Sequence, residues 1–148
     1  MPNKIIRILL SLLYAGDIKY APGSFSSFIT LLFIWFFIPD NFFFQAQIIL
    51  ISILVGMLLL YLYLDADLES NKDPQYVVID EMIGMMIAVF LLPKTILAYS
   101  LAFLLFRFFD ILKPSIVYES QKFDYGIGII LDDVLAGILT LIVLQGIF

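Results

Sequence analysis

Long apolar runs separated by short polar stretches dominate this chain, and they set the expected architecture. The strongly apolar segments cover residues 25–38, 42–64, 76–92, 95–109 and 126–148. The runs are long and do not alternate between apolar and polar residues, so they predict helices rather than the strands of a barrel. A helix needs about 20 residues to cross the hydrocarbon core of a bilayer. Segments 42–64 and 126–148 reach this length comfortably, and the other three are short.

The connections between the segments predict how they are arranged. Spacers 39–41 and 93–94 are short enough for tight helical hairpins, whereas residues 65–75 and 110–125 form longer polar loops. With five spans and the N-terminus inside, every basic residue except Lys94 lies on the inner side, which is the asymmetry typical of membrane proteins. This arrangement predicts an external C-terminus. A four-span arrangement, with the first segment re-entrant or the third and fourth incomplete, would change that side.

The N-terminal residues resemble a secretory signal only in part. Lys4 and Arg7 stand before a short apolar run, but Arg7 interrupts the run and no small-residue cleavage site follows. We expect an amphipathic helix along the cytoplasmic surface instead. The sequence therefore predicts an all-α integral membrane protein with a single domain over residues 1–148. The domain is a compact bundle of about four to five short transmembrane helices plus an N-terminal interfacial helix.

The composition agrees with a membrane protein and narrows the possible chemistry. The chain is 63% hydrophobic and only 14% charged, which is more apolar than a soluble domain of this size can accommodate. It has no Cys and no His, which excludes disulfides, cysteine-based metal sites, thiol nucleophiles and Ser-His triads. A net charge of −5 argues against nucleic acid as a partner. Any catalysis must use carboxylates, Lys, Arg, hydroxyls and backbone groups.

Four polar motifs stand near segment ends, all on the predicted inner side. The first is "APGSFSS", in which Pro22, Gly23 and Ser24 precede an apolar helix. Backbone N–H groups at a helix N-terminus, beside a glycine that allows close approach, can bind an anion. An ordinary N-cap by the Ser24 hydroxyl would explain the same residues.

Two of the motifs contain adjacent acids inside apolar segments. In "DPQYVVIDEMIG", Asp80 and Glu81 lie near the start of a helix, and Gly84 on the face of Asp80 would let a neighbouring helix approach. The helix dipole alone would also favour first-turn acids. In "YGIGIILDDVLAG", Asp132 and Asp133 have apolar residues on both sides. Like charges so close together call for a neutralising cation.

The remaining motif, "FRFFDILKP", supplies cations beside another acid. Arg107, Asp110 and Lys113 are spaced three apart and form one stripe if the helix reaches Lys113, although Pro114 discourages that. Basic residues snorkelling at the membrane interface would account for the two cations alone. With five candidate carboxylates and no His or Cys, the ligands favour Mg²⁺ over Zn²⁺. Mg²⁺ beside Lys and Arg suits phosphoryl chemistry on a phosphorylated lipid headgroup. A small cation transporter or channel subunit, with the acids as an ion path, is the alternative.

These motifs, in this order and at this spacing, resemble bacterial phosphatidylglycerophosphatase A. The resemblance covers about residues 15–145, and "FRFFDILKP" followed by "DDVLAG" is its most specific part. It implies a multi-pass enzyme of the bacterial inner membrane that acts in phospholipid biosynthesis with its active site facing the cytoplasm. The implied reaction is Mg²⁺-dependent hydrolysis of phosphatidylglycerophosphate to phosphatidylglycerol and phosphate at the inner leaflet. The sequence leaves the oligomeric state open.

The resemblance also implies a role for each motif. Arg107 and Lys113 would neutralise the phosphate, with backbone groups of Gly23 and Ser24 as further donors beside Pro22 in the same phosphate-binding motif. Either a metal-polarised water attacks directly or an aspartyl-phosphate forms, and the sequence does not separate these routes. The implied metal ligands are Asp80, Glu81, Asp132 and Asp133. The implied catalytic set is Asp80, Glu81, Arg107, Asp110, Lys113, Asp132 and Asp133.

Overall fold

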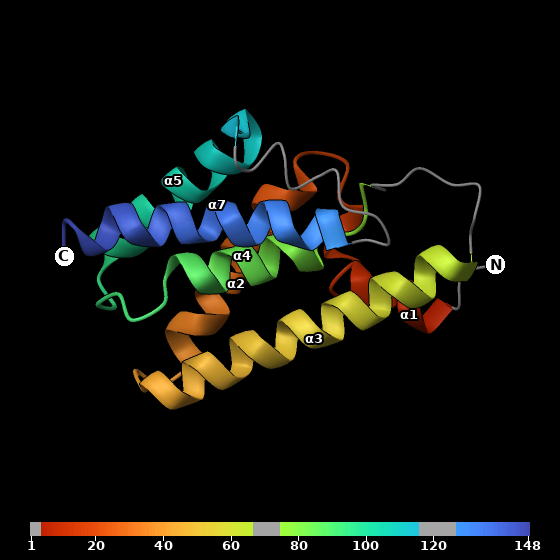
Figure 1. The fold of residues 1–148 in the computed structure, drawn as a ribbon, viewed down its shortest axis with the longest axis horizontal. Helices are drawn as coiled ribbons and strands as arrows, with labels where there is room; N and C mark the ends of the chain where they lie inside the picture. The colour runs from red at the N-terminus through yellow and green to blue at the C-terminus, as the bar shows by residue number, and fades with distance from the viewer. Residues whose placement is uncertain (1–3, 67–74, 116–126) are drawn as a thin grey trace.

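The computed structural model describes residues 4–66, 75–115 and 127–148, and these residues form helices without a strand (Figure 1). The all-helical prediction is confirmed for this part of the chain. Most of the two predicted polar loops lies outside the described residues, as do Lys72, Lys122 and Gly126. The elements are α1 (Lys4–Leu10), a 3₁₀ turn η1 (Ala15–Asp17), α2 (Pro22–Phe37), α3 (Phe42–Ala66), α4 (Ile79–Ala88), α5 (Ile96–Leu112) and α7 (Ile127–Gln145).

Among the described residues, two helices are long and apolar enough to cross a membrane, namely α3 over Phe42–Tyr63 and α7 over Ile127–Gln145. The helix α2 is apolar but has only 16 residues. Segment 76–92, expected as a short span, contains only the ten residues of α4. Ten residues give a helix of about 15 Å, half of the hydrocarbon thickness. The helix ends at Ala88 because the chain turns ahead of Pro93, where a regular helix is disfavoured.

The short helix α4 lies in the middle of the bundle (Figure 1). It packs mainly against α7 and also contacts α2, α3 and α5. All of its residues except Glu81 and Met82 are buried. In contrast, α2 and α3 expose a large number of Phe, Leu and Ile side chains, an arrangement that suits an apolar surrounding. The sequence therefore places Asp80 and Glu81 on the most enclosed of the described helices.

Two glycines fix the crossing of α4 and α7, which run in the same direction (Figure 1). A Cβ atom on Gly137 would lie 2.4 Å from the carbonyl oxygen of Gly84, and one on Gly84 would lie 2.6 Å from that of Asp133. Only glycine permits backbones to approach so closely. The prediction that Gly84 admits a neighbouring helix is therefore confirmed. Each glycine follows an aspartate by one turn, so the crossing brings Asp80 and Asp133 together.

The two short turns of the chain lie together at one end of the bundle. Gln45 connects them, because its Nε2 donates to the carbonyl of Pro39 and its Oε1 accepts the N–H of Leu91, each at 3.1 Å. Lys94 lies 3.6 Å from Asp40 in the neighbouring turn. The N-terminal helix and the start of α4 lie at the other end (Figure 1). The described polar motifs share that second end.

Candidate active site

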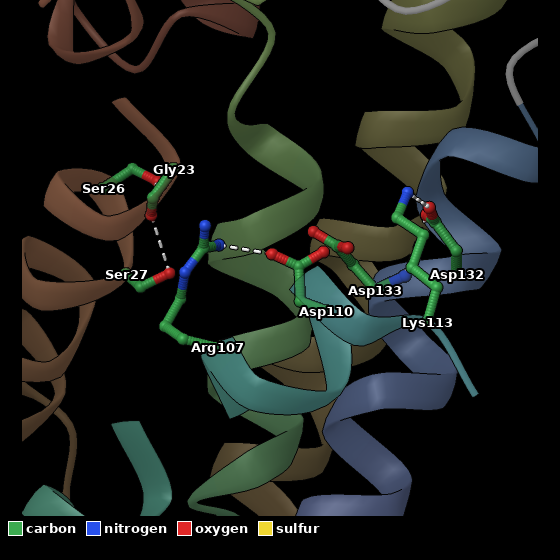
Figure 2. Close-up of polar contacts among 8 residues, drawn as sticks. All are labelled: Gly23, Ser26, Ser27, Arg107, Asp110, Lys113, Asp132 and Asp133. Atoms are coloured by element: carbon green, nitrogen blue, oxygen red, sulfur yellow. Dashed lines mark hydrogen bonds and ion pairs between the residues drawn. The ribbon is translucent and has the colours of Figure 1, made fainter. Parts of the chain in front are cut away.

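Four stretches that are far apart in the sequence meet at one end of the bundle. They are the start of α2, the start of α4, the end of α5 and the start of α7, and together they carry the four motifs. Figure 2 shows Arg107 and Asp110 of α5 between Gly23 of α2 and Asp133 of α7. The four motifs, which the sequence predicts to share one side, therefore lie together at one end of the bundle.

Three acids form the centre of this region. One carboxylate oxygen from each of Asp80, Glu81 and Asp133 lies within 4.8 Å of the others. Asp80 and Asp133 are buried, with exposed fractions of 7% and 2%. Within the described part of the chain, the buried atoms Glu81 Oε2 and Asp133 Oδ2 have no hydrogen-bond partner. Buried carboxylates at such separations are costly unless a cation neutralises them.

The donor set of this centre fits a magnesium ion. Its ligands are carboxylate oxygens, which hard divalent cations such as Mg²⁺ prefer. The buried oxygens of Glu81 and Asp133 that lack a hydrogen bond among the described residues favour a positive charge at the same place. Asp80, Glu81 and Asp133 are therefore the residues that could hold such an ion.

Arg107 and Asp110 lie beside the acidic centre. The Nη1 of Arg107 donates to Oδ2 of Asp110 at 2.5 Å, and both side chains are mostly buried. The carboxylates of Asp110 and Asp133 lie next to each other (Figure 2). Arg107 Nε is buried and has no hydrogen-bond partner among the described residues. Because only part of its guanidinium is engaged, Arg107 retains a donor for an anion.

The helix α2 begins earlier than the apolar run at 25–38 indicates. It starts at Pro22, whose fixed φ suits the first helical position. Ala21 precedes it in the left-handed region with φ 47, and no side chain caps the helix. The alternative in which the Ser24 hydroxyl is the N-cap is therefore wrong, because Ser24 lies within the first turn. The residues Pro22, Gly23 and Ser24 instead form an uncapped helix start, a ready place for an anion.

Gly23 lets this helix start approach the acids. A Cβ atom there would lie 2.4 Å from Oε1 of Glu81 and 3.1 Å from Nη1 of Arg107. The hydroxyls of Ser26 and Ser27 donate to the Gly23 carbonyl at 3.0 and 2.8 Å (Figure 2). These two buried serines were not among the predicted site residues. Their signal in the sequence is a pair of small hydroxyl residues one turn after a glycine in an apolar helix.

Lys113 and Asp132 form a separate pair next to the centre. The helix α5 ends at Leu112, and Lys113 follows in the left-handed region with φ 46, so the single stripe breaks as Pro114 predicts. Its Nζ lies 3.0 Å from Oδ2 of Asp132 (Figure 2). Asp132 Oδ1 accepts the N–H of Asp133 at 2.9 Å. The structure thus places Asp132 with Lys113 and does not bring it into the group of three acids.

The Lys113–Asp132 pair keeps the lysine charged. Burial lowers the pKa of Lys113, but the hydrogen bond to Asp132 and the charge of that carboxylate outweigh burial and raise it. Two basic side chains therefore lie near the acids among the described residues. Lys113 is paired with Asp132, and Arg107 is paired with Asp110.

The fold and the site together define a helical protein with membrane-capable helices and a buried acidic and basic centre at one end, suited to a metal ion and an anion. The chain belongs to the phosphatidylglycerophosphatase A family, whose match covers residues 8–148. The family indicated by the motifs is thereby confirmed.

Several relatives match parts of the chain. A Bacteroides thetaiotaomicron protein named "Putative phosphatidylinositol-3-phosphatase" is 43% identical over 82 residues, 52% of each chain. A Haemophilus influenzae protein named phosphatidylglycerophosphatase A is 48% identical over 69 residues, 45% of this chain and 42% of its own. An uncharacterized Methanocaldococcus jannaschii protein is 39% identical over 69 residues, 47% of each chain. The chain thus spans about half the length of the curated relatives that it matches. No solved structure matches it.

Proposed function

We propose that this protein is a lipid phosphatase that hydrolyses phosphatidylglycerophosphate to phosphatidylglycerol and phosphate. The observation that carries the proposal is the convergence of Asp80, Glu81 and Asp133 beside Arg107 and the uncapped start of α2. Family membership supports the reaction, as does the name of the Haemophilus influenzae relative. Acids for a cation next to donors for an anion are what phosphate-ester hydrolysis requires.

Asp80, Glu81 and Asp133 would hold Mg²⁺ in this enzyme. When bound, the ion supplies charge neutralisation at the phosphate and makes water a better nucleophile. Asp110 lies between Arg107 and Asp133 and sets the orientation of both side chains. In this proposal Asp132 contributes through Lys113, to which it is hydrogen-bonded, rather than as a ligand.

The basic groups and the helix start bind the phosphate. Arg107 donates to its oxygens, and the first-turn N–H groups of α2 at Gly23 and Ser24 add backbone donors. Lys113 provides a second positive charge. Water attacks phosphorus, the bond to the glycerol oxygen breaks, and one buried carboxylate accepts the proton of the water. The same carboxylic acid, or solvent with which it exchanges its proton, protonates the leaving oxygen; this completes phosphatidylglycerol, restores the carboxylate and releases phosphate.

The proposal includes a position in the bacterial inner membrane. In this proposal the described helices α2, α3, α4, α5 and α7 each run between the two ends of the bundle, with α4 as an internal pass enclosed by its neighbours. We place the end with α1, Arg107 and Lys113 at the cytoplasmic face, since the turn with Lys94 then lies outside. In this orientation Asp80 and Glu81, which are in the first turn of α4, would lie at the level of the lipid headgroups. An ion path would instead require acids near the bilayer midplane.

The experiment that tests the substrate is a comparison of lipids in mixed micelles. Purified protein is assayed for phosphate release from phosphatidylglycerophosphate, phosphatidylinositol 3-phosphate and phosphatidic acid, each at the same surface concentration with Mg²⁺. Glycerol 3-phosphate is the matched control without acyl chains. We expect phosphatidylglycerophosphate to give the highest kcat/KM and the soluble ester to react far more slowly, because remote contacts contribute to catalysis.

Other outcomes would overturn this assignment in different ways. If phosphatidylinositol 3-phosphate released phosphate fastest, the preferred substrate would instead be the lipid in the name of the Bacteroides thetaiotaomicron relative. No release from any phosphate ester by folded protein would reject the phosphatase. Cation flux into protein-containing liposomes would then support the ion path formed by the acids.

A further inference from the structure

The N-terminal segment, residues 4–17, lies directly against the chain that leads into α4. The N–H of Val78 donates to the carbonyl of Leu10 at 3.0 Å. The guanidinium of Arg7 lies 4.9 Å from the centre of the Tyr76 ring, a cation–π contact. The Tyr76 hydroxyl in turn donates to the hydroxyl of Tyr63 near the end of α3. Residues 76–78 are therefore held between the N-terminal segment and α3.

Gly16 makes the closest of these contacts. A Cβ atom at this position would lie 2.0 Å from the carbonyl oxygen of Tyr76 and 2.7 Å from its carbonyl carbon. The obstacle is backbone, so no side-chain rotation could relieve it. The 3₁₀ turn that contains Gly16 also packs against α2, which carries Gly23. Gly16 thus lies between α2 and the residues that lead into α4, and both helices carry residues of the candidate site.

The chain reverses direction through strained backbone angles just before Gly16, and this reversal positions Gly16 against the backbone of Tyr76. Leu12, Leu13 and Tyr14 all have positive φ, at 48°, 56° and 71°. Residues other than glycine rarely adopt a positive φ, and such backbone strain persists only where surrounding contacts enforce it. Ser11 supplies such contacts, since its Oγ accepts the N–H of Tyr14 at 3.1 Å and its carbonyl accepts that of Gly16 at 2.9 Å.

We propose that Gly16 is a positioning residue for the acidic centre. By lying on the backbone of Tyr76, it lets the N-terminal segment hold residues 76–78, and through them the first turn of α4. Asp80 and Glu81 are in that turn, so their approach to Asp133 depends on a segment outside the helices that carry the three carboxylates. The catalytic consequence rests on the proposed phosphatase function, whereas the structural coupling does not.

Hydrogen exchange tests the coupling, and metal dependence tests its consequence. In metal-free detergent solution, we expect Gly16→Ala to accelerate amide exchange of peptides covering residues 76–83, and to leave those of α5 unchanged. In the phosphatase assay, we expect the Mg²⁺ concentration for half-maximal rate to rise roughly 10- to 100-fold, as for other residues that orient metal ligands. The KM for lipid should change less than the Mg²⁺ requirement, because the new Cβ meets the backbone of Tyr76 and neither Arg107 nor Gly23.

Two further variants keep the test decisive. Gly146→Ala is the matched control, because its Cβ would come no closer than 3.4 Å to any neighbour, and both readouts should match the wild type. Arg7→Ala adds no atom and removes both the ring contact with Tyr76 and the ion pair with Asp17 in η1. It should therefore shift both readouts in the same direction as Gly16→Ala but by less, and it can be measured even if Gly16→Ala does not fold.

The outcomes separate this inference from the proposed function. Unchanged exchange at residues 76–83 in folded Gly16→Ala, or in Arg7→Ala where the glycine variant does not fold, would refute the positioning role. Faster exchange with an unchanged Mg²⁺ requirement would refute its link to the acids. If wild-type protein releases no phosphate from any lipid, the proposed function fails, and the exchange measurement still decides whether Gly16 holds the start of α4.

Discussion

The substitution Gly137→Ala tests whether the contact of α4 with α7 sets the acidic centre. The new methyl group would lie 2.4 Å from the carbonyl oxygen of Gly84, whereas ordinary contact begins at 3.4 Å. The two helices must therefore separate locally by roughly 1 Å. Asp133 lies one turn before Gly137 and Asp80 one turn before Gly84, so the separation moves these carboxylates apart.

The expected effects on stability and on activity differ in size. Alanine improves helix propensity by about 1 kcal/mol, and overpacking of a tight contact costs about 1 to 3 kcal/mol, so the net loss of stability is modest. A displacement of roughly 1 Å between catalytic groups can lower the rate about 100-fold. We therefore expect folded protein with a small decrease in Tm and a large decrease in kcat. The assay is phosphate release beside a thermal unfolding curve.

Gly56→Ala is the matched control for this prediction. Its Cβ would meet no backbone atom and would come closest to the tips of the Ile83 and Ile130 side chains, at 3.0 and 3.2 Å, which can rotate away. Near-wild-type activity is expected. If folded Gly137→Ala also kept wild-type kcat and Mg²⁺ dependence, the backbone contact would not set the geometry of the acids, and the reasoning would be wrong.

Three further predictions concern the groups around the acids. Arg107→Lys keeps the charge but loses the forked donor, so we expect kcat/KM to fall roughly 100-fold, and near-normal kinetics would remove Arg107 from phosphate binding. Gly23→Ala places a methyl group 2.4 Å from Oε1 of Glu81, so the Mg²⁺ requirement should rise in an activity titration, while an unchanged requirement would contradict the close approach. The raised pKa of Lys113 means that its pair with Asp132 stabilises the fold fully below the ordinary lysine pKa of 10.5 and loses this effect as the pH rises through the higher folded value. Lys113→Met should therefore lower Tm at pH 7 and reduce the further fall of Tm above pH 10.5, and parallel Tm curves would disprove the linkage.

The sequence predicted the helical class and the meeting of the four motifs, because apolar runs and the positions of basic residues are local signals. It did not predict the length of α4. Residues 76–92 are apolar apart from Asp80 and Glu81, so no change of pattern marks where the helix ends. Its end at Ala88 follows from the turn before Pro93 and from enclosure by neighbouring helices.

The different positions of Asp132 and Asp133 also required the structure to be seen. Adjacent helical residues point about 100° apart, which shows that the two side chains differ in direction but not which one faces α4. The contact between Gly84 and Gly137 fixes that rotation and directs Asp133 to the centre. Gly16 gave no signal at all, because its partner Tyr76 is distant in the sequence.

The most direct test of the account is phosphate release from phosphatidylglycerophosphate by wild-type protein, Asp133→Asn and Asp132→Asn, each with Mg²⁺ and with a chelator. We predict Mg²⁺-dependent release by the wild type, loss of activity of about 1,000-fold or more in Asp133→Asn, and a smaller loss in Asp132→Asn, which keeps an oxygen acceptor for Lys113. Release that persists in the chelator, or that survives in Asp133→Asn, would contradict the proposal that the three acids hold the catalytic ion.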